Sequence, residues 1–167
     1  VCVDESGSTE FDDKDAWAKA IAYALVDKVG SQGRCASVIH FSSASEVSED
    51  LFIPGQYTSE DVMNSARHFY CGGTNYEAPL RKAVSTMDSG VLSKADIVFI
   101  TDGQCSISSE FQDWLCSKLS EHHASVTGVL LDSGNNFEFS LKGFCKTIYR
   151  TSELTPSEIL SELVLLR

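Results

Sequence analysis

Short apolar runs alternate with amphipathic stretches along the whole chain. The most continuous run, 96–100, reads Asp-Ile-Val-Phe-Ile and is typical of a strand that is buried on both faces. The stretch 13–29 instead places its apolar residues three and four positions apart, as a helix does when one face packs on a core. This alternation predicts an α/β fold with a mainly parallel sheet. We therefore expect a Rossmann-like three-layer sandwich with a mostly parallel six-stranded sheet, one antiparallel edge strand and flanking helices.

The boundaries of the expected elements follow from periodicity and from turn residues. Strands are expected at 1–3, 36–41, 46–53, 96–100, 125–131 and 147–149. Helices are expected at 13–29, 76–87 and 109–122, with a short helix opening at 58 and a last one at 156. Gly30 is expected to end the first helix. The short connection between 36–41 and 46–53 predicts a hairpin, and a polar turn is expected at 133–136.

Chain length and charge limit the classes of function. The 167 residues suit one domain, 1–167, which we expect to have been cut from a longer protein because the chain opens directly on an apolar strand. Its formal net charge of −11 repels phosphate backbones and anionic lipids, so we expect no nucleic acid as a partner. No apolar run approaches the roughly 20 residues that a membrane span needs, so we expect no membrane insertion. A cation or a basic protein surface is the expected partner.

The six cysteines point to a reducing compartment. No two of them form a Cys-x-x-Cys pair, which argues against a zinc site built on thiolates. A domain of this size needs no disulfide for stability. These observations favour a cytoplasmic location.

Three polar clusters lie where chemistry is expected in a parallel α/β sheet. Asp-Glu-Ser-Gly-Ser at 4–8 follows the first strand, Thr-Asp-Gly at 101–103 follows the buried fourth strand, and Gly-Gly-Thr at 72–74 precedes a helix. Ligands of such sheets bind outside the carboxyl ends of the strands. The clusters offer hydroxyl and carboxylate oxygens, which suit Mg²⁺, Mn²⁺ or Ca²⁺ and do not suit zinc or copper.

These three motifs, in this order, resemble the von Willebrand factor type A (VWA) domain, and together they correspond to its metal-ion-dependent adhesion site. The resemblance covers nearly the whole chain. The segments Val-Cys-Val-Asp-Glu-Ser-Gly-Ser and Phe-Tyr-Cys-Gly-Gly-Thr are most similar to bacterial intracellular members of the ViaA and CoxE type, which work beside MoxR-class AAA+ ATPases. One departure is Thr9-Glu10, where many members have a methionine after the second serine.

The resemblance implies a metal-dependent protein-protein interaction domain that is not an enzyme. It implies three hydroxyl ligands to the ion: Ser6, Ser8 and Thr74. It also implies two carboxylates that act directly or through water: Asp4 and Asp102. The protein partner would supply an Asp or Glu to the metal, and a MoxR-type AAA+ ATPase is the expected partner. Acidic residues near the site would repel unsuitable partners: Glu5, Glu10, Asp12 and Asp13.

Other interpretations of the same residues remain open at this point. Asp4 and Ser6 could cap the first helix, Thr74 could cap the next, and the Asp-Gly at 102–103 could be an ordinary turn. The alternative function is a magnesium-dependent phosphatase of the haloacid-dehalogenase type, although Ser6 stands where its general acid would be needed. The sequence gives no indication of a functional role for His40 or His68.

Overall fold

The sheet brings together strands from the whole length of the chain. The computed structural model describes residues 1–92, 94–132 and 138–165, so the turn expected at 133–136 lies outside the described residues. The strands are β1 Cys2–Asp4, β2 Ala36–Phe41, β3 Val47–Phe52, β4 Ile97–Thr101, β5 Val126–Leu130 and β6 Thr147–Arg150. They lie in the order β3-β2-β1-β4-β5-β6, and only the β2–β3 pair is antiparallel among these neighbours. The mostly parallel six-stranded sheet with an antiparallel edge strand is confirmed.

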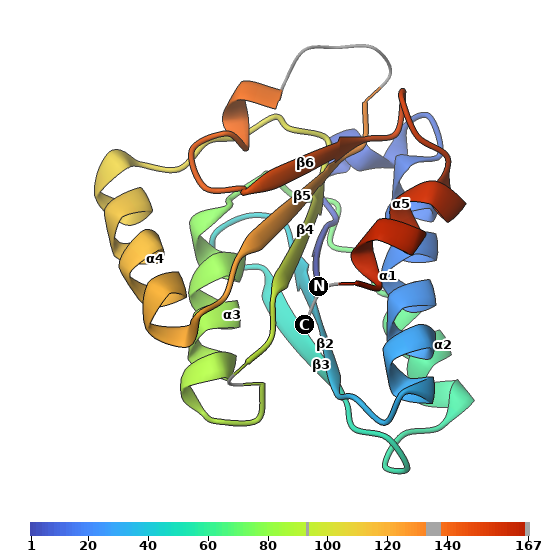
Figure 1. Ribbon diagram of the computed structural model, residues 1–167. Helices are drawn as coiled ribbons and strands as arrows, with labels where there is room; N and C mark the ends of the chain where they lie inside the picture. Colours follow the sequence, from blue (N-terminus) through green and yellow to red (C-terminus); the bar gives the residue numbers. More distant parts are fainter. Residues whose placement is uncertain (93, 133–137, 166–167) are drawn as a thin grey trace.

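Helices cover both faces of this sheet. They are α1 Lys14–Ser31, α2 Ser59–Arg67, α3 Glu77–Asp88, α4 Ser109–His122 and α5 Pro156–Leu163, with 3-10 turns η1 Gly7–Glu10 and η2 Glu138–Ser140. Figure 1 shows α3 and α4 on one face and α1, α2 and α5 on the other, which is the expected three-layer arrangement. Within the described ranges, no helix combines the length and the apolar character that crossing a bilayer requires.

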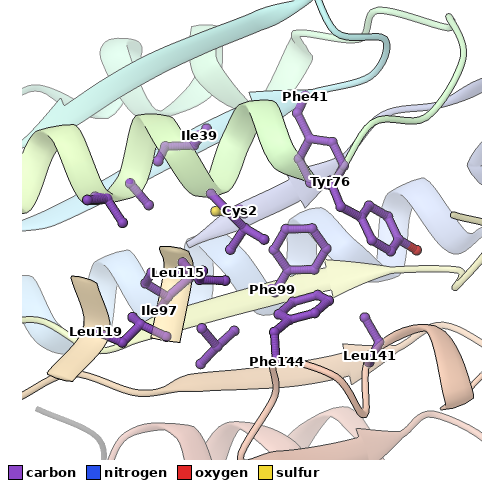
Figure 2. Close-up of a cluster of buried hydrophobic side chains, with 14 of the residues drawn as sticks. Cys2, Ile39, Phe41, Tyr76, Ile97, Phe99, Leu115, Leu119, Leu141 and Phe144 are labelled. Atoms are coloured by element: carbon purple, nitrogen blue, oxygen red, sulfur yellow. The ribbon is translucent and has the colours of Figure 1, made fainter. Parts of the chain in front are cut away.

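Aromatic rings fill the core between the sheet and the α3–α4 layer. Tyr76, just before α3, meets Phe99 of β4 edge to face, with ring centroids 5.0 Å apart, and Phe144 meets Phe99 at 5.5 Å (Figure 2). Phe41 of β2 lies 5.1 Å from the same Phe99 ring. Every residue of β4 is buried, as expected for a central strand with both faces covered. This packing anchors the inner strands and so fixes where their carboxyl ends emerge.

The end of α1 differs from the expectation. Gly30 lies inside the helix, which continues to Ser31. The residue that turns the chain is Gly33, which adopts a positive φ of 73° and donates from its backbone N–H to the carbonyl of Gly30. The next residue, Arg34, donates to the carbonyl of Val29. The helix therefore ends in a glycine-dependent C-cap, two residues later than the sequence pattern indicated.

The strand order places a topological switch point between β1 and β4. From β1 the chain continues to β2 on one side of β1 and returns later as β4 on its other side. Loops that leave the carboxyl ends of two such strands diverge, and the crevice between them is where α/β sheets bind ligands. The motifs at 4–8 and 101–103 begin at this crevice, because β1 ends at Asp4 and β4 ends at Thr101.

Candidate functional site

The site is built around Asp4, the last residue of β1. Its side chain is buried and both carboxylate oxygens accept hydrogen bonds: Oδ1 from the backbone N–H of Ser6 at 2.9 Å, and Oδ2 from the hydroxyl of Thr101 at 2.5 Å. Tyr76 Oη lies 2.9 Å from Thr101 Oγ1 and can donate to it, so the aromatic core supports this arrangement. Burial raises the pKa of Asp4 to about 6, against the opposing effect of the hydrogen bonds from Thr101 and Ser6. The protein thus holds a desolvated carboxyl group in a fixed orientation.

Two serine hydroxyls lie together just beyond Asp4. The Oγ atoms of Ser6 and Ser8 are 3.1 Å apart, because η1 curls the chain immediately after β1. Thr9 supports this turn by donating from its hydroxyl to the carbonyl of Ser6 at 2.7 Å. Adjacent ligands of an octahedral ion with bonds near 2.1 Å are about 3.0 Å apart. The two hydroxyls therefore have the spacing of neighbouring ligands of a small divalent cation.

Asp102 adds the second carboxylate immediately after β4. It is buried, and its Oδ2 accepts a hydrogen bond of 3.0 Å from the side-chain amide of Gln104. Lys14, the first residue of α1, places its ammonium nitrogen 3.8 Å from the same oxygen. A cationic group therefore already lies at this carboxylate. The sequence pattern gave no indication of the contact between Lys14 and Asp102, because it depends on how α1 packs against the switch point.

The Gly-Gly-Thr segment is attached to the first motif by backbone hydrogen bonds. Gly7 donates to the carbonyl of Gly72 at 2.9 Å, and Cys71 donates to the carbonyl of Glu5 at 3.0 Å. On its other side, the carbonyl of Thr74 accepts from the thiol of Cys105, which follows the Thr-Asp-Gly motif. The segment that carries Thr74 thus lies between the other two motifs.

The capping interpretations of Asp4, Ser6 and Thr74 are not supported. The N-cap residue of α1 is Asp13, and the Asp4 carboxylate binds Ser6 and Thr101. Ser6 occupies the N-cap position of the short turn η1, but its side chain makes no capping hydrogen bond there. At the start of α3, where Tyr76 is the N-cap residue, the backbone N–H of Ala78 donates to the side-chain oxygen of Asn75 at 2.9 Å, so Asn75 rather than Thr74 is the side-chain partner there. Together, Asp4, Ser6, Ser8, Thr74 and Asp102 are called the carboxyl-edge site below.

Glu5 is where the structure departs most from the sequence interpretation. We expected it among acidic residues that face a partner, but its side chain is fully buried. Its two carboxylate oxygens each lie 2.7 Å from a histidine Nδ1, one of His40 and one of His68. Alternation along an extended chain turns Glu5 away from Asp4 and Ser6, and this was the one available signal for its burial. The two histidines could not be linked to it without the strand order.

Comparison with known proteins identifies the family. The family model of the von Willebrand factor type A domain matches residues 1–104. The chain belongs to the von Willebrand factor type A domain family. The VWA match spans all three polar motifs.

Similar proteins agree with this VWA assignment. An uncharacterized protein of Methanocaldococcus jannaschii, MJ0077, is 28% identical over 98% of this chain, which spans 41% of that relative's length. A solved von Willebrand factor type A structure from Catenulispora acidiphila superposes with a TM-score of 0.69 at 16% identity, covering 98% of this chain and 40% of that chain. An aerotolerance-related membrane protein from Bacteroides fragilis gives a TM-score of 0.70 at 16% identity, covering 96% of this chain and 93% of that chain. At these identities the solved structures show a shared fold.

Proposed function

We propose that this VWA domain binds a protein partner through a divalent cation held at the carboxyl-edge site. The observation that carries the proposal is the 3.1 Å approach of the Ser6 and Ser8 hydroxyls beside the carboxylates at the switch point. All donors of the site are hard oxygens, which fits Mg²⁺ or Mn²⁺ best and Ca²⁺ next. VWA domains are generally protein-interaction domains, and the metal dependence proposed here is a specific form of that role.

Each residue of the site has a distinct proposed task. Ser6, Ser8 and Thr74 present hydroxyl oxygens to the cation. Asp4 is held rigidly by Ser6 and Thr101, so it supplies negative charge at a fixed position. Asp102 supplies the second charge, in competition with Lys14. When bound, the cation supplies Lewis acidity for an anionic oxygen from the partner.

Charge counting favours a carboxylate as the group that the partner contributes. Asp4 and Asp102 at most neutralise a divalent ion, and the other three donors are neutral hydroxyls. An open coordination position on such an ion prefers an anionic oxygen to water, so the partner would supply an Asp or Glu. The chain's net charge of −11 requires basic residues around that carboxylate, which would add selectivity.

The proposed partner is a MoxR-type AAA+ ATPase, and the proposed location is the cytoplasm. Support comes from the likeness of segments 1–8 and 69–74 to the ViaA and CoxE type and from the cysteine pattern, which favours a reducing compartment. Because the chain spans 41% and 30% of two relatives from Methanocaldococcus jannaschii, the activity of a longer host protein is part of the proposal.

Binding is favoured over the phosphatase alternative by the direction of the side chains. A phosphatase of that type needs a carboxyl group two residues after Asp4 as its general acid, and Ser6 stands there with its hydroxyl against Ser8. The neighbouring carboxylate, Glu5, is turned away and engaged with His40 and His68. Neither group supplies the proton that the leaving group would need.

Metal-induced stabilisation tests the cation site. After treatment with EDTA, the protein should unfold at a higher temperature when Mg²⁺ or Mn²⁺ is added. The free energy of unfolding should rise by about 2.7 kcal/mol when the ion is at 100 times its dissociation constant. Ser8→Ala and Asp102→Asn should remove most of this gain. Ser117→Ala and Asp113→Asn, which change the same residue types at exposed positions on α4, should retain it. Equal stabilisation of all four variants would contradict the assignment of the site.

A binding experiment tests the partner separately. A purified MoxR-type ATPase from the same genome should bind the domain in Mg²⁺ and lose binding in EDTA and with Ser8→Ala. Retained metal stabilisation without any binding would reject this partner and leave the cation site intact. Binding that is equal in Mg²⁺ and EDTA would reject the metal bridge.

A further inference from the structure

A cluster of one glutamate and two histidines lies beside the carboxyl-edge site and outside it. Glu5 follows β1, His40 belongs to β2 and His68 follows α2, and we call them the Glu-His cluster. The two Nδ1 atoms each lie 2.7 Å from a different oxygen of Glu5, and one ligand atom from each residue lies within 4.8 Å of the others. The His40 and His68 ring centroids are 4.8 Å apart. Three segments distant in the sequence therefore direct metal-binding atoms toward one point.

The ring of His40 is held in the cluster by partners at both of its nitrogens. Its Nδ1 faces Glu5, and its Nε2 lies 3.3 Å from a carboxylate oxygen of Asp50 and 3.0 Å from the hydroxyl oxygen of Ser65. A neutral imidazole carries one N–H. With that proton on Nδ1, His40 donates to Glu5, and its Nε2 can accept from the hydroxyl of Ser65, which itself accepts from Tyr23 at 2.6 Å. A metal ion at Nδ1 would take the place of that proton while the ring keeps its orientation. A metal at Nδ1 leaves the Nε2–H free to donate toward Asp50 and Ser65.

We propose that the Glu-His cluster is a second metal site, selective for a borderline divalent transition-metal ion such as Zn²⁺. Two imidazole nitrogens and one carboxylate are a ligand set that zinc uses in proteins, with a fourth position left for water or another ligand. The arrangement at His40 matches the usual surroundings of a metal-bound histidine, whose other ring nitrogen donates to a carboxylate or another acceptor. This proposal does not depend on the function proposed for the carboxyl-edge site.

Metal binding requires both histidines to move from their hydrogen-bonded positions. Two ligands of a tetrahedral zinc ion with bonds of about 2.0–2.1 Å are about 3.3 Å apart. The Nδ1-to-oxygen distances of 2.7 Å are shorter than this by about 0.6 Å, so each histidine must move outward slightly as its hydrogen bond to Glu5 is replaced. His68 is suited to this movement, because its side chain is 36% exposed and comes from the segment between α2 and α3.

Access and charge also suit a cation. His68, Ser65 and Asp50 line a cleft of about 510 Å³ bordered by residues of β3 and α2, and this cleft gives a path to the cluster. The ammonium group of Lys19 lies near the carboxylates of Glu5 and Asp15. A third carboxylate, that of Asp50, lies next to His40. With neutral histidines these four groups carry a formal charge of −2, which a divalent ion cancels.

A metal in this cluster would tie together the segments that carry the carboxyl-edge site. Glu5 lies between Asp4 and Ser6 in the chain, and its carbonyl accepts from Cys71, next to the Gly-Gly-Thr segment. Zinc bound to Glu5 and His68 would hold that segment against the first motif. The inferred role of the second metal is therefore to stabilise the loop arrangement in which Thr74 lies between the other motifs.

Cobalt spectroscopy tests the second site, because Co²⁺ replaces zinc and absorbs visible light. The folded domain is titrated with Co²⁺ under reducing conditions in a large excess of Mg²⁺, which occupies hard-oxygen sites. We expect one equivalent to bind with the intense bands of a four- or five-coordinate ion that has nitrogen ligands, and Zn²⁺ to displace it. His68→Asn should weaken binding at least about tenfold, since even the loss of an outer partner of a ligand costs that much. Glu5→Gln, which keeps the size of this buried side chain, should do the same.

Two control variants exclude other ligands. His123→Asn changes an exposed histidine in a left-handed conformation that asparagine tolerates, and it should bind Co²⁺ as the wild type does. Cys71→Ser removes the exposed thiol nearest in sequence to His68 and should also leave the spectrum unchanged. The proposal is overturned if no Co²⁺ binds in excess Mg²⁺, or if folded His68→Asn and Glu5→Gln proteins bind it as tightly as His123→Asn.

Discussion

The hydroxyl of Thr101 donates a 2.5 Å hydrogen bond to Oδ2 of Asp4, and both side chains are completely buried. These residues lie 97 positions apart, and their contact joins the carboxyl ends of β1 and β4. Thr101 is supported in turn by Tyr76, whose ring packs on Phe99 (Figure 2). The orientation of the central carboxylate therefore depends on the aromatic core beneath it.

Thr101→Val should destabilise the domain more than Thr101→Ser. Valine preserves the volume but removes the donor to Asp4 and the acceptor for Tyr76, leaving two buried polar groups without this partner. We expect a loss of about 3 kcal/mol in the free energy of unfolding. Serine keeps the hydroxyl and loses one methyl group, at a cost of about 1 kcal/mol. Urea denaturation of the metal-free proteins measures both values, and a larger loss for the serine variant would contradict the importance of this hydrogen bond.

The raised pKa of Asp4 predicts how the stability of the metal-free protein changes with pH. Burial favours the protonated form in the folded state, where the pKa is about 6 compared with an ordinary value of 3.8. The folded protein therefore binds more protons than the unfolded chain between these values. The stabilising contribution is fully present below about pH 4 and is lost as the pH rises to about 6, by roughly 3 kcal/mol in all.

Asp4→Asn checks this pH dependence, because asparagine does not titrate. In EDTA, the difference in free energy of unfolding between the variant and the wild type should shift in favour of the variant as the pH rises from 4 to 6. A difference that stays constant over this range would show that Asp4 titrates normally. Denaturant titrations at several pH values provide the measurement.

The sheet and the positions of the three motifs could be predicted from the sequence because they depend on local patterns. Apolar runs such as 96–100 identify a buried strand without knowledge of its neighbours, and polar residues after it must lie at the carboxyl edge. The end of α1 was harder to predict, since Gly30 and Gly33 can each end a helix. Only backbone conformation shows that Gly33 takes the positive φ.

Contacts between distant segments could not be predicted in the same way. His40 is part of an apolar strand, and its pairing with Glu5 follows from β1 and β2 being neighbours with Val3 opposite His40. His68 reaches Glu5 across 63 positions, by way of the chain that leaves α2. No periodicity connects these residues, so the sequence alone gives no indication that either histidine contacts Glu5.

Lys14→Gln should tighten Mg²⁺ binding. The ammonium group of Lys14 lies 3.8 Å from Asp102 and competes with a cation for that carboxylate. Partly exposed ion pairs of this kind contribute about 0.5–1 kcal/mol, so its removal should increase the affinity about two- to fivefold. Lys28→Gln is the matched control, because it removes the same charge from an exposed position near the other end of α1. Isothermal titration calorimetry at fixed ionic strength compares them, and an unchanged affinity in Lys14→Gln would place the ion away from Asp102.

Thr74 and Asn75 are adjacent, yet substitutions at the two positions should affect different properties: Mg²⁺ affinity at Thr74 and stability at Asn75. Thr74→Ala removes a proposed hydroxyl ligand, so it should weaken Mg²⁺ binding and partner binding, while the stability of the metal-free protein changes by less than about 1 kcal/mol. Asn75→Ala removes the side chain that accepts from Ala78 at the start of α3, so it should cost about 1 kcal/mol of stability and leave Mg²⁺ affinity nearly unchanged. Denaturation in EDTA measures the free energy of unfolding, and calorimetric titration measures Mg²⁺ affinity. If both variants lose stability and neither loses Mg²⁺ affinity, Thr74 is a structural residue of the turn, and the cation must be held by the two serines and the two aspartates without it.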